Sequence, residues 1–342
     1  MSKSTYVSLF AAHQTTSDVD AQVEFYKDWG MVIDRGFDAL EDIPEQYYKA
    51  RGVSKADLVK TVCMRMPTDP FMHLILYQWK TLNRGPGWPA PFNQIGSRGL
   101  SMLVEDVNAE VQRVKKDFPD IKFLYDKLTI NRRWGKTTTA LFVDREDIQV
   151  ELIEIEKGSQ YDLGRVQLPA YEDTQWLHFM LNCSNYDKSM EFYQSFGMAH
   201  DSAVDFRPGV GFHPFGKAHY AKQWKEAYDL AQDDLTGVGF LRSDRDPSGM
   251  HLELMDWRPG SLLTPSDRPV WHQKGICRYC FRVKDHAESL KEQQLRGTRI
   301  YVADQRGCLG WGDTIWFDCG DVDGNVLTKE QWFPQRAWGE KN

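Results

Sequence analysis

The chain has 342 residues, and its 42 lysines and arginines against 49 aspartates and glutamates give a net charge of −7 and a pI near 5.8. This acidic balance, without a dense run of basic residues, argues against a surface that binds nucleic-acid phosphates. No stretch approaches the ~18 consecutive apolar residues of a membrane-spanning helix, and the polar N-terminus lacks the features of a signal peptide. We therefore expect a cytoplasmic protein with neither a nucleic-acid nor a membrane partner.

The aromatic content is high, at 13%, with 12 Trp, 14 Tyr and 18 Phe. An aromatic-lined pocket for a small-molecule substrate would explain it, and so would an aromatic core. The six cysteines are too few for a disulfide scaffold. The sequence leaves room for a homo-oligomer.

The chain repeats itself. Residues 17–31 align with residues 184–198 in a shared F-Y-x-x-x-G-M pattern, and residues 72–79 align with residues 250–257. The second half, 173–335, therefore copies the first half, 1–158, with an insertion between the two matched segments. We expect each half to be one domain.

Each half contains a finer repeated unit. A short apolar strand precedes a helix whose start carries a Ser-x-x-Asp arrangement, as at Ser17 and Ser184, because such side chains cap the free N–H groups of a helix. Three strands follow each helix. The sequence therefore predicts an internally duplicated α+β chain of four βαβββ modules that form two curved mixed-sheet cups, at residues 5–80, 96–156, 173–258 and 273–333.

The module pattern, with its closing D-P-S-G-x-x-x-E-L strand at residues 246–254, resembles the vicinal oxygen chelate superfamily. This superfamily includes glyoxalase I, extradiol dioxygenases, epimerases and bleomycin-resistance proteins. The resemblance covers nearly the whole chain and suggests that modules two and three share one cup, and modules one and four the other, as in single-chain glyoxalases. The alternative is that each half closes on itself, which would place Glu151 far from His178. It does not specify the reaction, since one scaffold hosts many chemistries.

The resemblance also implies where metal ligands stand: on the first and last strands of each module. These positions hold Ala11, Gly99, His178 and Arg278, and then Ile75, Glu151, Glu253 and Thr328. Three of the eight suit a metal, namely Glu151, His178 and Glu253. They resemble the His and two Glu of glyoxalase I, with Gly99 in the place of the fourth ligand. The alternative is a plain hydrogen-bonded pair of His178 and Glu253.

Other residues are candidates for substrate binding. His13 and His73 are expected side by side on antiparallel strands of module one, and His251 repeats His73 in the other half. We expect a structural or substrate-contacting role for them.

Arg278 and Arg282 share one strand face, where they could bind a substrate carboxylate or phosphate. The alternative is that these arginines form a buried ion pair with Glu330.

The insertion of module three carries His213, His219 and Tyr220. Insertions over a cup often form lids, so His213 or His219 could act as a general acid or base and Tyr220 could contact substrate. Exposed loop histidines are the alternative.

These observations favour an enzyme, a metal-dependent lyase or isomerase. Its substrate would be small, aromatic and equipped with adjacent oxygens, and a divalent ion (Zn, Ni, Co, Mn or Fe) would be held by Glu151, His178 and Glu253, with Glu253 also moving a proton. One alternative is an extradiol dioxygenase acting on a catechol-like substrate, although its iron typically needs two His and one carboxylate. The other is a metal-free binding protein of the bleomycin-resistance type.

Overall fold

The structure is a computed structural model that describes residues 5–34, 45–49, 51–69, 71–82, 91–132, 135–159, 175–195, 197–201, 234–263, 270–309 and 312–333. The chain divides into two compact units. The first comprises Met1–Trp88, Ser195–Gly197 and Ser266–Asn342, and the second comprises Pro89–Gln194 and Met198–Pro265. The compact units thus do not coincide with the repeated halves, because each unit contains one module from each half.

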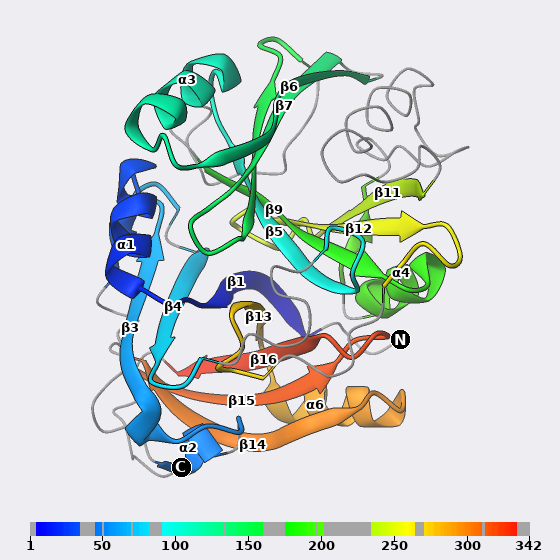
Figure 1. The fold of residues 1–342 in the computed structure, drawn as a ribbon. Coiled ribbons are helices and arrows are strands. Elements are labelled where there is room, and N and C mark those ends of the chain that lie inside the picture. Colours follow the sequence, from blue (N-terminus) through cyan, green and yellow to red (C-terminus); the bar gives the residue numbers. More distant parts are fainter. Residues whose placement is uncertain are drawn as a thin grey trace. The chain divides into compact units, whose positions relative to one another are not determined.

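The first unit contains modules one and four (Figure 1). Its eight strands form one sheet in the order β14-β15-β16-β13-β1-β4-β3-β2. Its elements are β1 (Tyr6–Thr15), α1 (Val19–Asp28), β2 (Val32–Ile33), α2 (Glu45–Lys49), η2 (Lys55–Asp57), β3 (Leu58–Arg65), β4 (His73–Trp79), β13 (Gly275–Val283), α6 (His286–Leu295), β14 (Ile300–Leu309), β15 (Gly312–Gly320) and β16 (Val326–Phe333).

The second unit contains modules two and three. Its sheet has the order β10-β11-β12-β9-β5-β8-β7-β6. Its elements are β5 (Gly96–Leu103), α3 (Val107–Asp117), β6 (Lys122–Arg132), β7 (Gly135–Val143), β8 (Gln149–Ile155), β9 (Gln175–Cys183), α4 (Tyr186–Ser195), β10 (Ala199–His200), β11 (Leu235–Arg242) and β12 (His251–Trp257).

The helices lie where the sequence predicts, but two caps stand one residue later than expected: Asp18 and not Ser17 caps α1, and Asn185 and not Ser184 accepts from the backbone N–H of Lys188 in α4. Asp18, Asp106 and Asp285 have extended backbone, and each side chain accepts a hydrogen bond from the backbone N–H three residues on. This satisfies a donor that the helix itself leaves unpaired. Each helix then packs on strands of its own module, α1 on β3 and β4, α3 on β6 to β8, and α6 on β14 to β16. No helix in the described ranges is long and apolar enough to span a membrane.

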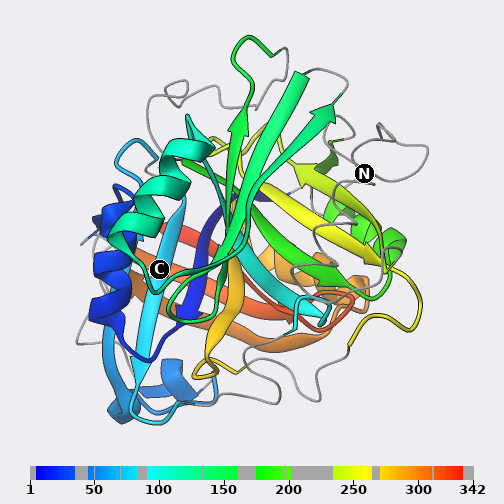
Figure 2. The same cartoon turned by 45° about the horizontal axis from the view of Figure 1, so that its top comes forward.

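Two first strands meet at the centre of each sheet. β5 pairs antiparallel with β9, and each of them pairs parallel with the last strand of its own module, β8 or β12. Figure 2 shows β5 in cyan beside β9 in green. The other sheet repeats this arrangement around β1 and β13. The α+β fold and the expected pairing of modules two with three and one with four are confirmed.

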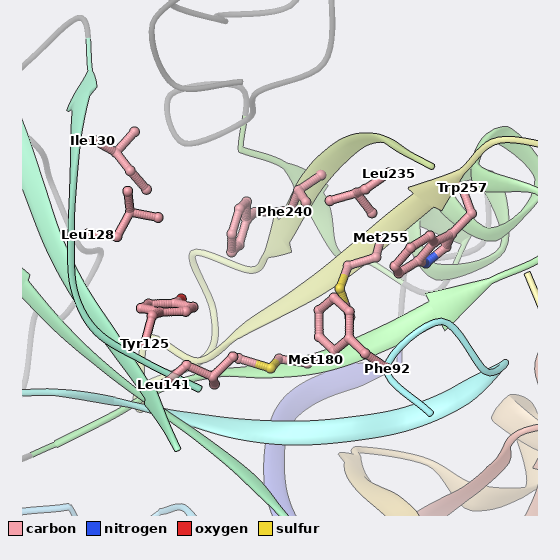
Figure 3. Packing of buried hydrophobic residues seen from close by; sticks show 11 residues of the cluster. Phe92, Tyr125, Leu128, Ile130, Leu141, Met180, Leu235, Phe240, Met255 and Trp257 are labelled. Carbon is pink, nitrogen blue, oxygen red and sulfur yellow. The ribbon is translucent and has the colours of Figure 1, made fainter. Parts of the chain in front are cut away.

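The second sheet curves around an apolar interior. Figure 3 shows side chains of β6, β7, β9, β11 and β12 that point into one shared space. The side chains that fill this interior are buried and include Tyr125, Leu141, Met180, Phe240 and Met255. Since inward positions alternate along a strand, polar residues two places from these members face the same interior.

Gly99 marks a close approach between β5 and β8. A Cβ atom at this position would overlap the carbonyl oxygen of Gln149 and lie 2.9 Å from its Cβ. No side chain therefore fits at this position while the two strands keep their present spacing.

We predict that Gly99→Ala lowers the free energy of unfolding by about 1–3 kcal/mol, because the new methyl group must push β8 away from β5. Chemical denaturation measures the change. The control is Ser97→Ala on the same strand, which we expect to stay within about 0.5 kcal/mol of the unchanged protein. Equal stability of Gly99→Ala and the unchanged protein would contradict the close approach.

Candidate metal centre

Glu151 on β8, His178 on β9 and Glu253 on β12 converge in the second unit. The Nε2 atom of His178 lies 3.2 Å from Oε2 of Glu151 and 3.1 Å from Oε2 of Glu253. One ligand atom from each residue lies within 4.8 Å of the other two, and all three residues are buried. The expected convergence of these three side chains is confirmed.

The strand register explains the convergence. His178 is the antiparallel partner of Ser101 on β5, and Ser101 is also the parallel partner of Glu151 on β8. On the other side, His178 is the partner of His251, so Glu253 lies two residues further along β12 on the same face. Two carboxylates thus flank one imidazole from opposite sides.

Burial and charge act together on this cluster. Burial raises the pKa of Glu151, against the opposing influence of His178. Burial also lowers the pKa of His178, but the charges of Glu253 and Glu151 outweigh it and raise the pKa of His178 to about 9. The imidazole of His178 is therefore mostly protonated at neutral pH, and its positive charge lies between the side chains of Glu151 and Glu253.

The donor set fits a divalent metal. His178 Nε2 is buried and makes no hydrogen bond of standard geometry with any residue that the structure describes, although two carboxylate oxygens are close. An imidazole nitrogen and two carboxylate oxygens are common ligands of zinc-like ions. A cation would offset the repulsion between two buried carboxylates, which a neutral imidazole could not.

Apolar side chains enclose the cluster. The ring of Phe240 packs edge-on against His178, with ring centroids 5.3 Å apart. Phe240 is the register partner of Glu253, and Leu141 is the register partner of Glu151. Figure 3 shows Phe240 and Leu141 within the apolar interior. The protein therefore surrounds a polar centre with a low-dielectric wall.

The fourth ligand position remains without a side chain. Gly99 occupies it, and the nearby Gln149 backbone leaves no space for a Cβ atom. Of the four ligand positions that the sequence pattern names in this unit, three therefore carry a side chain that could bind a metal.

The architecture matches solved structures of one superfamily. Glyoxalase I from Zea mays superposes with a TM-score of 0.59 at 15% identity, over 95% of this chain and 92% of that chain. A mutant form of the same enzyme gives 0.61 at 15% identity, over 95% and 93%. The chain has the vicinal oxygen chelate fold. A putative dioxygenase from Bacillus subtilis gives 0.55 at 13% identity, over 98% and 87%. No family model and no curated protein matches the sequence.

His73 and His251 lie at equivalent positions in the two vicinal oxygen chelate units and make equivalent contacts. Nε2 of His73 lies 3.3 Å from Asp34, and Nε2 of His251 lies 3.3 Å from Asp201. Burial lowers the pKa of His251, while Asp201 opposes the shift. In the first unit this pair lies beside Ala11 and Ile75, which stand at the positions of His178 and Glu253, and both aspartates were missed by the sequence pattern.

The prediction that His13 and His73 lie side by side is wrong. β1 and β4 are parallel, so His73 is the partner of Ala11 and His13 is the partner of Ile75. The antiparallel assumption had placed the two histidines opposite each other. His13 instead stacks on Tyr77, with ring centroids 5.3 Å apart.

Arg278 stands in the first unit where Gly99 stands in the second. Its Nη1 donates to Asp318 at 2.9 Å, and both side chains are buried. Thr328, at the position equivalent to Glu151, donates to the same carboxylate at 2.6 Å. A fixed guanidinium thus occupies the first unit's ligand positions.

A second cation, Arg51, strengthens this cluster. Its guanidinium carbon lies 4.5 Å from the ring centroid of Trp271 and 3.8 Å from that of Trp316, and Nε is 3.8 Å from Asp318. Sequence reasoning missed Arg51 and Asp318, because neither stands at a spacing that the module pattern specifies. The paired arginines and the nearby indoles leave no donor set for a divalent cation among these residues.

Arg282 packs its guanidinium over Trp332, 4.5 Å from the ring centroid, and is the register partner of Glu330. Burial raises the pKa of Glu330 to about 7. The carboxylate that pairs with Arg278 at 2.9 Å is Asp318, whereas the sequence had suggested Glu330.

His213, His219 and Tyr220 lie outside the described residues.

We predict that Arg278→Met lowers the free energy of unfolding by about 3–5 kcal/mol, because it leaves the buried Asp318 without its closest cation. Thermal and chemical denaturation measure the loss, and the metal content of the folded fraction should not change. The matched control is Lys136→Met, which removes an exposed ion pair with Glu156 and should cost less than about 1 kcal/mol. Similar losses for both variants would contradict the role of Arg278.

We predict that metal binding near neutral pH releases about one proton per ion, because His178 must lose its proton to become a ligand. Below pH 9, apparent affinity should therefore rise about tenfold per pH unit. Calorimetry in buffers of different ionisation enthalpy counts the protons. Binding without proton release would show that His178 is not a ligand.

Proposed function

We propose that the protein is a metal-dependent lyase or isomerase that acts on a small substrate with two adjacent oxygens. The observation that supports this proposal is the buried convergence of Glu151, His178 and Glu253 inside an apolar interior. A divalent ion held there would supply Lewis acidity that stabilises an enolate-like charge on the substrate oxygens.

The residues of the chain divide the remaining work. His178 and Glu151 would hold the centre, and Glu253 would take and return the proton at the substrate carbon, because its carboxylate lies beside the centre in the apolar interior. Phe240, Leu141 and Met180 exclude water and accommodate the apolar part of the substrate. Tyr125 and Phe240 favour an aromatic substituent there.

A ring-cleaving dioxygenase is the alternative within the same fold. Oxygen-activating iron typically takes two His and one carboxylate, whereas the cluster of the described residues contains one His and two Glu. The fold is compatible with either reaction, because one scaffold supports many chemistries. Oxygen uptake therefore belongs in the experiment.

The test starts with elemental analysis of the purified protein, where we expect one divalent ion per chain. In D2O, the zinc-loaded protein should then accelerate deuterium exchange at the methylene group of 2-hydroxyacetophenone, a probe with adjacent oxygens and an aryl group. Glu253→Gln should lower this exchange by about 10²–10⁴-fold. Glu151→Gln and His178→Gln should lower metal content as well. The matched control is Ile75→Val, at the equivalent position of the first unit.

Two other outcomes would favour the alternative functions. Oxygen consumption with catechol and iron(II), without exchange, would favour the dioxygenase. Tight binding of an aromatic compound by a protein that takes up no metal would favour the metal-free binding protein.

A further inference from the structure

The interior of the first unit contains a cage for a guanidinium group. The guanidinium carbon of Arg51 lies between two indoles, 4.5 Å from the ring centroid of Trp271 and 3.8 Å from that of Trp316. The carboxylate of Asp318 lies on the same cation, 3.8 Å from Nε. Aromatic faces and a buried carboxylate suit a planar, weakly hydrated cation better than a compact, strongly hydrated one. Arg51 itself shows that a guanidinium group fits this cage.

The carboxylate of the cage is held by the sheet rather than by Arg51. Oδ2 of Asp318 accepts a hydrogen bond from Nη1 of Arg278 at 2.9 Å, and Oδ1 accepts from the hydroxyl of Thr328 at 2.6 Å. The 3.8 Å separation between Arg51 Nε and Asp318 is longer than a hydrogen bond. Asp318 therefore keeps its place when Arg51 leaves.

Arg51 also shares its cage with a second cation. The guanidinium carbon of Arg278 lies 5.2 Å from the ring centroid of Trp271, the same indole that Arg51 contacts. Both arginines are buried. Repulsion between two cations in a low-dielectric interior opposes the seating of Arg51, whereas the close ion pair with Asp318 stabilises Arg278. Of the two arginines, Arg51 is thus the one that the cage holds less tightly.

Arg51 reaches the cage from a segment outside the sheet, residues 45–55, which lies between β2 and β3 in the chain. Hydrogen bonds close this segment on itself. The backbone N–H of Arg51 donates to the carbonyl oxygen of Tyr48 at 2.9 Å, and the hydroxyl of Ser54 donates to the carboxylate of Glu45 at 3.2 Å. Because these bonds move with the segment, its displacement leaves the strand ladders of the sheet paired.

We propose that the interior of the first unit is a binding site for a guanidinium compound, and that Arg51 is a built-in ligand which such a compound replaces. Residues 45–55 are then the element that closes the site. The proposal uses residues of the first unit only, so it stands or falls independently of the metal centre.

Ethylguanidinium and its neutral analogue ethylurea test the cage in Arg51→Ala. This substitution removes the side chain from Cγ to the guanidinium group, and ethylguanidinium supplies the same atoms. We expect it to bind Arg51→Ala about tenfold more tightly than ethylurea does, because Asp318 and the two indoles attract the cation alone. Titration calorimetry measures both affinities. The matched control is Arg282→Ala, which uncovers the indole of Trp332 and should show no such preference.

Amide hydrogen exchange tests the replacement in the unchanged protein. A compound that binds only after Arg51 has left shifts the population toward the open segment. At about ten times its dissociation constant for Arg51→Ala, ethylguanidinium should therefore speed the exchange of the amides of residues 45–55 about tenfold relative to ethylurea. The amides of β15 and β16 should keep their rates.

Further variants keep the test decisive. Arg51→Met fills the cage with a long uncharged side chain and should bind neither compound. If Arg51→Ala does not fold alone, ethylguanidinium and not ethylurea should restore its folding.

The outcomes separate the two parts of the proposal. Equal affinity of Arg51→Ala for both compounds, or a failure of ethylguanidinium to restore a variant that does not fold, would overturn the guanidinium site. Binding by Arg51→Ala without faster exchange of residues 45–55 in the unchanged protein would overturn the replacement of Arg51.

Discussion

The antiparallel pairing of β5 with β9 is the interaction on which the candidate centre depends. It brings modules from different halves of the chain into one sheet and sets His178 opposite Ser101. The parallel ladders to β8 and β12 then bring Glu151 and Glu253 to the two sides of His178. A shift of one residue in any of these ladders would turn a ligand to the other face of the sheet. The geometry of the centre is thus a property of strand register.

The two units of the duplicated fold balance buried negative charge in two different ways. In the second unit, two buried carboxylates and an imidazole leave negative charge that an added cation can offset. In the first unit, Arg278 and Arg51 supply cations from the chain itself, and Asp318 and the indoles of Trp271 and Trp316 hold them. Because a guanidinium of the chain already balances the charge of Asp318, the first unit does not need a bound cation there. The equivalent positions of the two units thus differ in whether the chain itself supplies the cations.

Much of the fold could be predicted from the sequence, because repeats, helix caps and strand alternation are local signals, whereas the three candidate ligands followed from the resemblance. The position of Glu151 relative to His178 followed only from the resemblance, which supplied the pairing of modules. The error at His13 and His73 arose because residue patterns do not distinguish parallel from antiparallel neighbours. Asp318, Asp201 and Arg51 were missed because their partners are distant in sequence.

Gly99 shows why a missing ligand is informative. In the sequence it was a gap in the expected set of four ligands. In the structure, the close Gln149 backbone makes glycine a requirement of the β5–β8 approach. The same approach aligns Ser101 with Glu151 two residues further along the ladder. The absence of a fourth side chain and the presence of a hydroxyl beside one glutamate thus arise from one local geometry.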